Sequence, residues 1–233
     1  MRHLDREIEN LKKKLLALSA LVEENLRRAL SAVENGDAVL AALAIDNDFA
    51  IDLMEVDVEE DCLKTLALYQ PVATDLRFLI AAVKINATLE RIGDVAVNIA
   101  ECALTIAENT RPVVAFDIVG LAEKAQAMVG NALDALVAGD PILARTVLAS
   151  DDEVDDLDAA FGDLLSIEIR KNPEDTDVLI ALMQVSRFIE RFADHATSIA
   201  EDVIYMVEGQ IPRHYAKRVA AQRDSEGHPA TDS

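Results

Sequence analysis

Apolar residues recur every three to four positions along almost the whole chain, which is the spacing of amphipathic helices. Glycine followed by aspartate, at Gly36-Asp37 and Gly139-Asp140, offers a residue that ends one helix and an N-cap for the next. Prolines mark other connections, at Pro71, Pro112 and Pro173. The pattern predicts an all-α protein with six long helices, at about 4–34, 37–69, 73–108, 115–138, 141–171 and 175–208.

The second half of the chain repeats the first. Asp48-xxx-Asp52 recurs as Asp151-xxx-Asp155 at an offset of 103 residues. In the third helix of each half the offset is 100, and "ERIGDVAVNIAE" at 90–101 shares 7 of its 12 residues with "ERFADHATSIAE". The length difference falls in the turn before this helix, where a duplication tolerates it.

Short turns between long helices favour antiparallel neighbours. The predicted fold class is therefore a tandem duplication of an antiparallel three-helix bundle. We expect the first bundle at 1–110 and the second at 113–210, followed by a polar, disordered tail at 211–233.

Charge narrows the range of functions. The chain has 22 Lys and Arg against 43 Asp and Glu, a formal charge of −21, which argues against binding to nucleic acids or to anionic lipid. Its most apolar stretches are interrupted by polar residues, so no membrane span is expected. Cys62 and Cys102 form no CxxC motif, and no apolar signal segment is evident at the N-terminus. These features favour a reduced, cytoplasmic protein.

Acidic residues of the repeat share helix faces with apolar residues. With about 100° between successive residues, Glu90 and Asp94 lie on the same arc as Leu79. A carboxylate on an apolar stripe is costly unless it is paired or binds a metal. Oxygen ligands four residues apart suit hard ions such as Mg²⁺, Mn²⁺, Ca²⁺ or iron. We predict one carboxylate metal site per half, formed by Asp48, Asp52, Glu90 and Asp94 and by Asp151, Asp155, Glu190 and Asp194.

Three alternatives stay open. The acids are solvated, or they dock basic partner surfaces without metal, or they hold two metals in a phosphohydrolase. Recurrence on four helices favours cation binding over simple solvation. No nucleophile, phosphate-binding glycine loop or isolated acid–base pair can be named, so we predict no enzymatic activity and no organic cofactor.

Two other features are expected to have structural roles. His195 points about 100° away from Asp194, which favours a place at the rim or surface over metal ligation. Asp75 and Arg77 stand at the start of the third helix, where we expect a cap region and a local ion pair. A contact with a partner protein is the alternative for these two residues.

The chain resembles the PhoU family, bacterial accessory proteins of phosphate-specific transport. The resemblance covers about 1–210 and rests on three segments: "DLMEVDVEEDC", "QPVATDLRFLIAAVKINATLERIGDVAVNIAE" and "IERFADHATSIAEDVIYMVEGQ". It implies a cytoplasmic, non-catalytic, all-helical homodimer that links the phosphate ABC transporter ATPase to a sensor histidine kinase and represses signalling when phosphate is plentiful. It also implies carboxylate-bound metal, iron in particular, at the eight acids named above, with Mn²⁺, Mg²⁺, Ca²⁺ or Zn²⁺ as other candidates. A metal-independent interaction module for another transport or signalling system is the alternative function.

The second half departs from the first at two positions of this motif. Gly93 is replaced by Ala193, and Asn98 by the shorter oxygen donor Ser198. If the glycine permits a close approach, we expect the second site to bind cations less tightly than the first.

Overall fold

The computed structural model describes residues 3–109 and 117–209, which contain six long α-helices and no strand. The helices confirm the predicted elements to within about three residues at each end. Pro112 and the tail expected at 211–233 lie outside the described residues. The elements are α1 His3–Asn35, α2 Ala38–Tyr69, α3 Ala73–Ala107, α4 Ile118–Ala138, α5 Pro141–Lys171, a 3₁₀ turn at Pro173–Asp175 and α6 Thr176–Glu208.

The same capping device starts the second helix of each half. Asp37 accepts hydrogen bonds from the backbone amides of Val39 (2.9 Å) and Leu40 (3.1 Å), and Asp140 does the same at the start of α5. The preceding residues, Gly36 and Gly139, have φ of 61° and 65°, a left-handed conformation that glycine adopts without strain. These turns set the second helix of each half antiparallel to the first.

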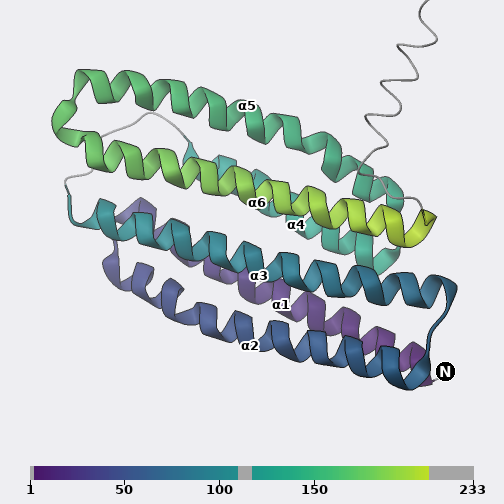
Figure 1. The fold of residues 1–233 in the computed structure, drawn as a ribbon. Helices are drawn as coiled ribbons and strands as arrows, with labels where there is room; N and C mark the ends of the chain where they lie inside the picture. Colours follow the sequence, from purple (N-terminus) through teal and green to yellow (C-terminus); the bar gives the residue numbers. More distant parts are fainter. Residues whose placement is uncertain (1–2, 110–116, 210–233) are drawn as a thin grey trace, which may run out of the picture.

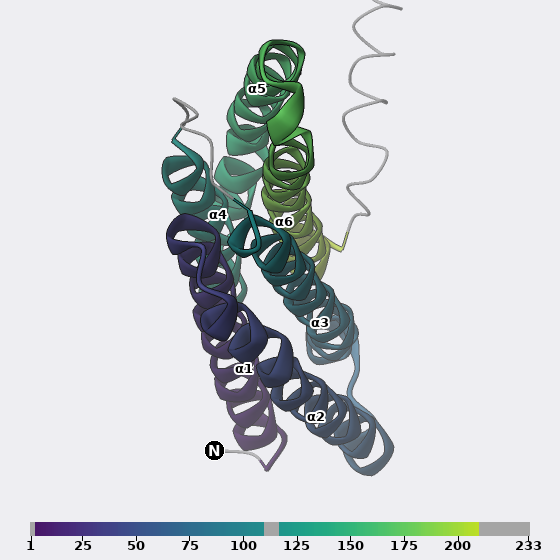
Figure 2. The ribbon, with the colours of Figure 1, turned by 90° about the vertical axis from the view of Figure 1, so that its left-hand side faces the viewer.

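The helices form two layers (Figure 1). The order α2–α3–α6–α5 makes one row, and α1 and α4 lie side by side behind it, as Figure 2 shows from the end. A single cluster of buried apolar residues runs through all six helices. The fold is a tandem pair of three-helix bundles packed into one body, whereas the boundaries at 110 and 113 stay a prediction. Within the described residues, no helix combines the length and apolar character that crossing a membrane requires.

The two halves meet where α3 and α6 lie antiparallel. The Lys84 ammonium donates to the Asp202 carboxylate (2.8 Å), and the Cys102 thiol donates to the side-chain amide oxygen of Gln184 (3.6 Å). Lys84 and Gln184 hold equivalent positions in the repeat, as do Cys102 and Asp202. The two contacts are therefore related by an approximate twofold axis between the halves.

The prediction of an ion pair between Asp75 and Arg77 is wrong. The Arg77 guanidinium instead donates to the Met206 carbonyl (2.9 Å) and to the Thr74 hydroxyl (3.3 Å). Met206 lies in the last turn of α6, where carbonyl oxygens lack a partner within their own helix, so the guanidinium supplies one. Arg77 thus links the start of α3 to the end of α6.

Candidate metal site

The first acid face lies between α2 and α3. Burial raises the pKa of Asp48 to about 6, and the charges of Asp52 and Asp94 add to the effect. Burial likewise raises the pKa of Glu90, with further contributions from Asp94, Asp52 and Glu55. Because these effects act between helices, α2 and α3 bring the predicted acids of the first half to one face.

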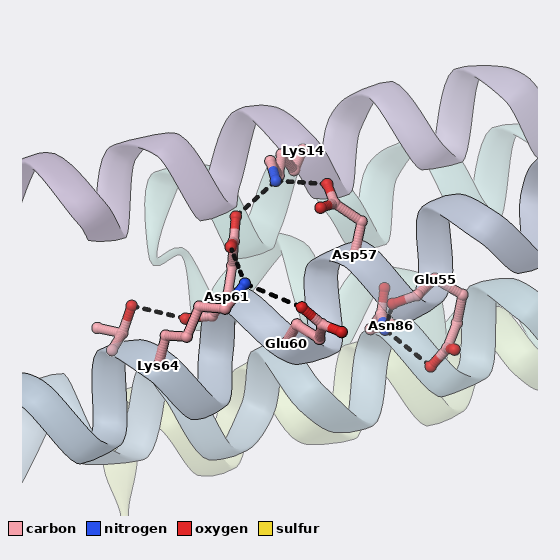
Figure 3. A network of polar contacts seen from close by, with 8 residues as sticks. Lys14, Glu55, Asp57, Glu60, Asp61, Lys64 and Asn86 are labelled. Carbon is pink, nitrogen blue, oxygen red and sulfur yellow. Dashed lines mark hydrogen bonds and ion pairs between the residues drawn. The ribbon is translucent and has the colours of Figure 1, made fainter.

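A buried amide ties this face together. The Asn86 side-chain amide on α3 donates to both the backbone carbonyl and the carboxylate of Glu55 on α2, at 2.9 Å each (Figure 3). Asn86 is fully buried. It therefore fixes the spacing of the two helices beside the acids, and sequence reasoning did not assign it a role.

Gly93 allows a close approach of α2 to α3. A Cβ atom at this position would lie 3.1 Å from the Ile51 side chain and 3.2 Å from the Asp48 carboxylate. Both distances are tighter than ordinary contacts. The missing side chain therefore makes room for the Asp48 carboxylate against α3, as the sequence suggested.

The second acid face lies between α5 and α6. Burial raises the pKa of Asp151 to about 6, reinforced by the charges of Asp155, Asp194 and Asp152. Burial raises the pKa of Glu190 to about 7, with further effects from four aspartates that include Asp194 and Asp155. The pKa of Asp155 is also raised, mainly by burial. The structure therefore brings the four predicted acids of the second half together as well.

The second face repeats the polar tie in a shorter form. The Ser186 hydroxyl on α6 donates to the Asp158 carboxylate on α5 at 2.6 Å. Ser186 and Asp158 hold the positions of Asn86 and Glu55. One carboxylate oxygen of Asp151 is buried and has no hydrogen-bond partner among the described residues.

The larger residue at Ala193, which replaces Gly93, is accompanied by a smaller residue on the neighbouring helix. The first half places Ile51 against Gly93, whereas the second half has the smaller Val154 at the position of Ile51. Both Val154 and Ala193 are buried. One methyl group has in effect moved from the second helix to the third, so Ala193 gives no reason for a wider or weaker second site.

Other acids of α2 lie on a different side of that helix and form ion pairs with lysines. Lys14 of α1 donates to Asp57 and Asp61, and Lys64 donates to Glu60 (Figure 3). By contrast, no ion pair among the described residues joins a Lys, Arg or His to any of the eight predicted ligands, Asp48, Asp52, Glu90, Asp94, Asp151, Asp155, Glu190 and Asp194. The two acid faces are thus concentrations of negative charge without ion pairs, and only the more distant charge of Arg91 partly offsets that of Glu90.

The acid faces suit a metal ion by the chemical type of their ligand atoms. Both faces present carboxylate oxygens only, the ligand type of hard cations, and the unpartnered oxygen of Asp151 is an acceptor that a cation would satisfy. Within 3–109 and 117–209, no three Asp, Glu, His or Cys side chains converge closely enough to hold an ion. Binding would therefore require carboxylates to turn toward one another.

His195 follows Asp194 of the second acid face along α6, and the Asp194 charge favours its protonated form. It is half-buried, and burial lowers its pKa, helped by the charges of Arg191 and Arg91. Since Arg91 belongs to α3 and His195 to α6, the imidazole lies near the junction of the two halves. A half-buried histidine is compatible with the rim position that the sequence predicted.

The chain is similar to proteins of one family along most of its length. The family model described as "PhoU domain" matches twice, at residues 15–103 and 118–203. A phosphate-specific transport system accessory protein PhoU homolog from Aquifex aeolicus is 36% identical over 91% of this chain and 96% of its own length. The accessory protein PhoU from Serratia marcescens is 34% identical over 89% of this chain and 86% of its own length.

Solved structures agree with the sequence comparisons. The crystal structure of PhoU from Pseudomonas aeruginosa superposes with a TM-score of 0.84, at 33% identity, over 89% of this chain and all of that one. The phosphate transport system regulatory protein PhoU from Streptococcus pneumoniae superposes with a TM-score of 0.83, at 28% identity, over 90% of this chain and 99% of that one. Each family-model match covers most of one three-helix unit.

Proposed function

The chain belongs to the PhoU family, and from this membership we propose that it regulates phosphate transport as an accessory protein. The observation that carries the proposal is that this chain aligns with 96% of the Aquifex aeolicus phosphate-transport relative, with both repeats matched. In finer detail, we propose a non-catalytic cytoplasmic adaptor that couples the phosphate ABC transporter ATPase to the phosphate sensor histidine kinase. In phosphate-rich conditions it would repress both uptake and the starvation response.

A reporter experiment tests this role. Deleting the gene should switch on a phosphate-starvation promoter in phosphate-rich medium, and the full chain supplied in trans should restore repression. Repression that is unchanged by the deletion would contradict the proposed role. Direct binding of the purified chain to the transporter ATPase and to the kinase, measured separately, identifies which coupling it provides.

We further propose that each acid face binds a hard cation. Asp48, Asp52, Glu90 and Asp94 would hold it in the first half, and Asp151, Asp155, Glu190 and Asp194 in the second. Carboxylates that come from two adjacent helices and lack ion-pair partners support this, because bringing them together without a cation costs free energy. Family resemblance favours iron, with Mn²⁺, Mg²⁺, Ca²⁺ or Zn²⁺ as other candidates. Elemental analysis of protein purified without a chelating resin identifies the ion.

The alternative is a metal-independent helical module for another transport or signalling system. It predicts that partner binding persists in chelator and weakens steeply as salt is added, because acidic faces would then act only by charge. Loss of binding in chelator, with recovery when the ion is restored, supports the metal-binding adaptor instead. We also propose that the chain forms a homodimer, which light scattering of the purified protein tests.

A further inference from the structure

The side of α2 that faces away from the core is apolar. Positions 39, 42, 46, 49, 53, 56, 60, 63 and 67 follow one another in alternating steps of three and four, and all nine are exposed. We name these nine positions the outer seam of α2. Seven of them are apolar. The larger apolar members, between 51% and 71% exposed, are Val39, Phe49, Leu53, Val56 and Leu63.

This spacing is the one by which a second helix packs along the first in a coiled coil. The opposite side of α2 is already buried, at Ile51, Val58 and Cys62. A helix with apolar residues all round is normally covered on both sides. The described residues cover α2 on its inner side and leave the outer seam without a neighbour.

The duplication provides an internal comparison. At an offset of 103, the buried residues Ile51 and Val58 correspond to Val154 and Phe161, which are also buried, so α5 is in the same register. Its nine outer positions nevertheless include only three apolar residues. Phe49 and Leu53 correspond there to Asp152 and Asp156. The apolar outer seam is therefore a property of the first half and not a consequence of the fold.

Charges on and beside the outer seam show what kind of helix it suits. Asp46 and Glu60 lie within it, and Glu59 flanks it on one side. Glu60 is paired with Lys64, whereas Asp46 has no ion-pair partner among the described residues. A docking helix that carries Lys or Arg would give these acids partners.

A second copy of α2 suits the outer seam poorly. Antiparallel pairing centred on Leu53 sets Asp46 of one copy against Glu60 of the other, twice. Parallel pairing in register sets each acid against its own copy. Like charges that meet at a helix interface oppose association, and the chain's net charge of −21 adds to this.

We propose that the outer seam of α2 docks an amphipathic helix of a partner protein, with apolar residues at spacings of three and four and Lys or Arg along its flanks. The inference rests on the proposed adaptor role, for which it names a docking surface. Any homodimer of the chain then uses a different surface.

A synthetic peptide tests the proposal. The probe is a fluorescein-labelled peptide of four heptads with Leu at the seam positions and Lys at the flanks, titrated with the full chain and followed by anisotropy. The double variant Phe49→Asp/Leu53→Asp installs the residues of α5 and should weaken binding by about tenfold or more. The matched control, Ala149→Asp/Ala159→Asp, adds the same charge to the outer side of α5 and should bind as the wild type does. Circular dichroism of both variants checks that the helices are retained.

A peptide with the same lysines but Ser in place of Leu should bind about tenfold more weakly, because the seam then has no apolar partner. Equal binding of the α2 double variant and the wild type would overturn the proposal, since charge alone would then explain the affinity. A dimer seen by light scattering in the wild type and lost in the α2 double variant would also overturn it. The peptide assay needs no component of phosphate signalling, so failure of the adaptor role in cells would leave its outcome unchanged.

Discussion

The two halves of the molecule agree closely on the acid faces between their second and third helices and differ on the side of the second helix that faces away from the core. Each half sets the same four acids between its second and third helices, and each ties those helices by a polar bond, Asn86–Glu55 in one and Ser186–Asp158 in the other. The packing beneath the acids differs, because Gly93 in the first half is Ala193 in the second. A change on one helix is matched by a change on its neighbour, so the charge arrangement survives.

The outer faces lack such agreement. α2 is apolar there, whereas α5 is mostly polar and charged. Two copies of one helix under the same inner constraint should stay alike where both meet the same neighbours. The halves therefore share the arrangement of their acids and differ in the side chains that their second helices expose to solvent.

The largest expected effect comes from breaking the polar tie in each half. Asn86→Ala removes two hydrogen bonds and leaves a cavity at a fully buried site, so it should destabilise the protein by about 2–3 kcal/mol. Ser186→Ala removes a single hydrogen bond to Asp158 and should cost about 1 kcal/mol. Urea unfolding of both variants measures the difference. Asn86→Ser, which copies the second half, should fall between the wild type and Asn86→Ala. Equal losses of stability in the two alanine variants would show that the Asn86–Glu55 bonds contribute no more than the Ser186–Asp158 bond.

A smaller effect is expected from exchanging the packing. Gly93→Ala brings a methyl group to 3.1 Å from Ile51, and the resulting strain, partly offset by the better helix propensity of alanine, should cost about 1 kcal/mol. The double variant Ile51→Val/Gly93→Ala copies the second half and should regain most of that loss. Thermal unfolding compares the three proteins. A double variant no more stable than Gly93→Ala would refute the exchange of one methyl group between the helices.

The dependence of stability on pH should reveal the raised pKa of the acid faces, that of Glu190 above all. The pKa of Glu190 is raised from 4.5 to about 7. Between these pH values the folded protein therefore keeps a proton on Glu190 that the unfolded chain has lost. This contribution to stability is present below about pH 4.5 and is lost as pH rises through about 7. Without divalent cations, the Tm should therefore fall by a few degrees between pH 5 and pH 7.5. Added Mn²⁺ should restore it at pH 7.5.

Glutamine variants show which acid face causes the fall of Tm with rising pH. Glu190→Gln should flatten the pH profile of Tm more than Glu90→Gln, because burial and four aspartates raise the pKa of Glu190 to about 7, whereas the charge of Arg91 partly offsets the rise at Glu90. Scanning fluorimetry in a chelating buffer measures both. A flatter profile for Glu90→Gln would reverse the order of the two faces.

The smallest effect concerns the junction between the halves. Lys84→Gln copies the residue at the equivalent position 184 and removes the ion pair with Asp202. Since the Lys84 side chain is 46% exposed, solvent screens the pair and the loss should stay below about 1 kcal/mol. The difference from the wild type should shrink in 1 M salt, as followed by thermal unfolding. A large, salt-independent loss would mean that Lys84 contributes chiefly by packing against Tyr205, over whose ring it lies.

Sequence reasoning predicted the helices because each has both an apolar period and a legible end, such as Gly139-Asp140. It also placed Glu90 and Asp94 on one face correctly, since a helical wheel depends only on residues of the same helix. The match of Ile51 with Gly93 was out of reach, because it depends on which residues of two different helices touch.

The outer seam of α2 shows a different limit. Its apolar residues are visible in the sequence, but α2 is apolar on both sides, and periodicity alone does not say which side faces the core. Arg77 is similar: its neighbour Asp75 offered an obvious partner, whereas the actual acceptor, the Met206 carbonyl, lies at the far end of the chain.

The central claim is that each half carries its own carboxylate cation site. It is tested most directly by metal content, measured by elemental analysis on wild type, Asp94→Ala, Asp194→Ala and the double variant, all purified without a chelating resin. Circular dichroism of the same samples checks that helicity is retained. Each single variant should lose the metal of its own half, and the double variant should lose both. Metal content that stays unchanged in the double variant would contradict it.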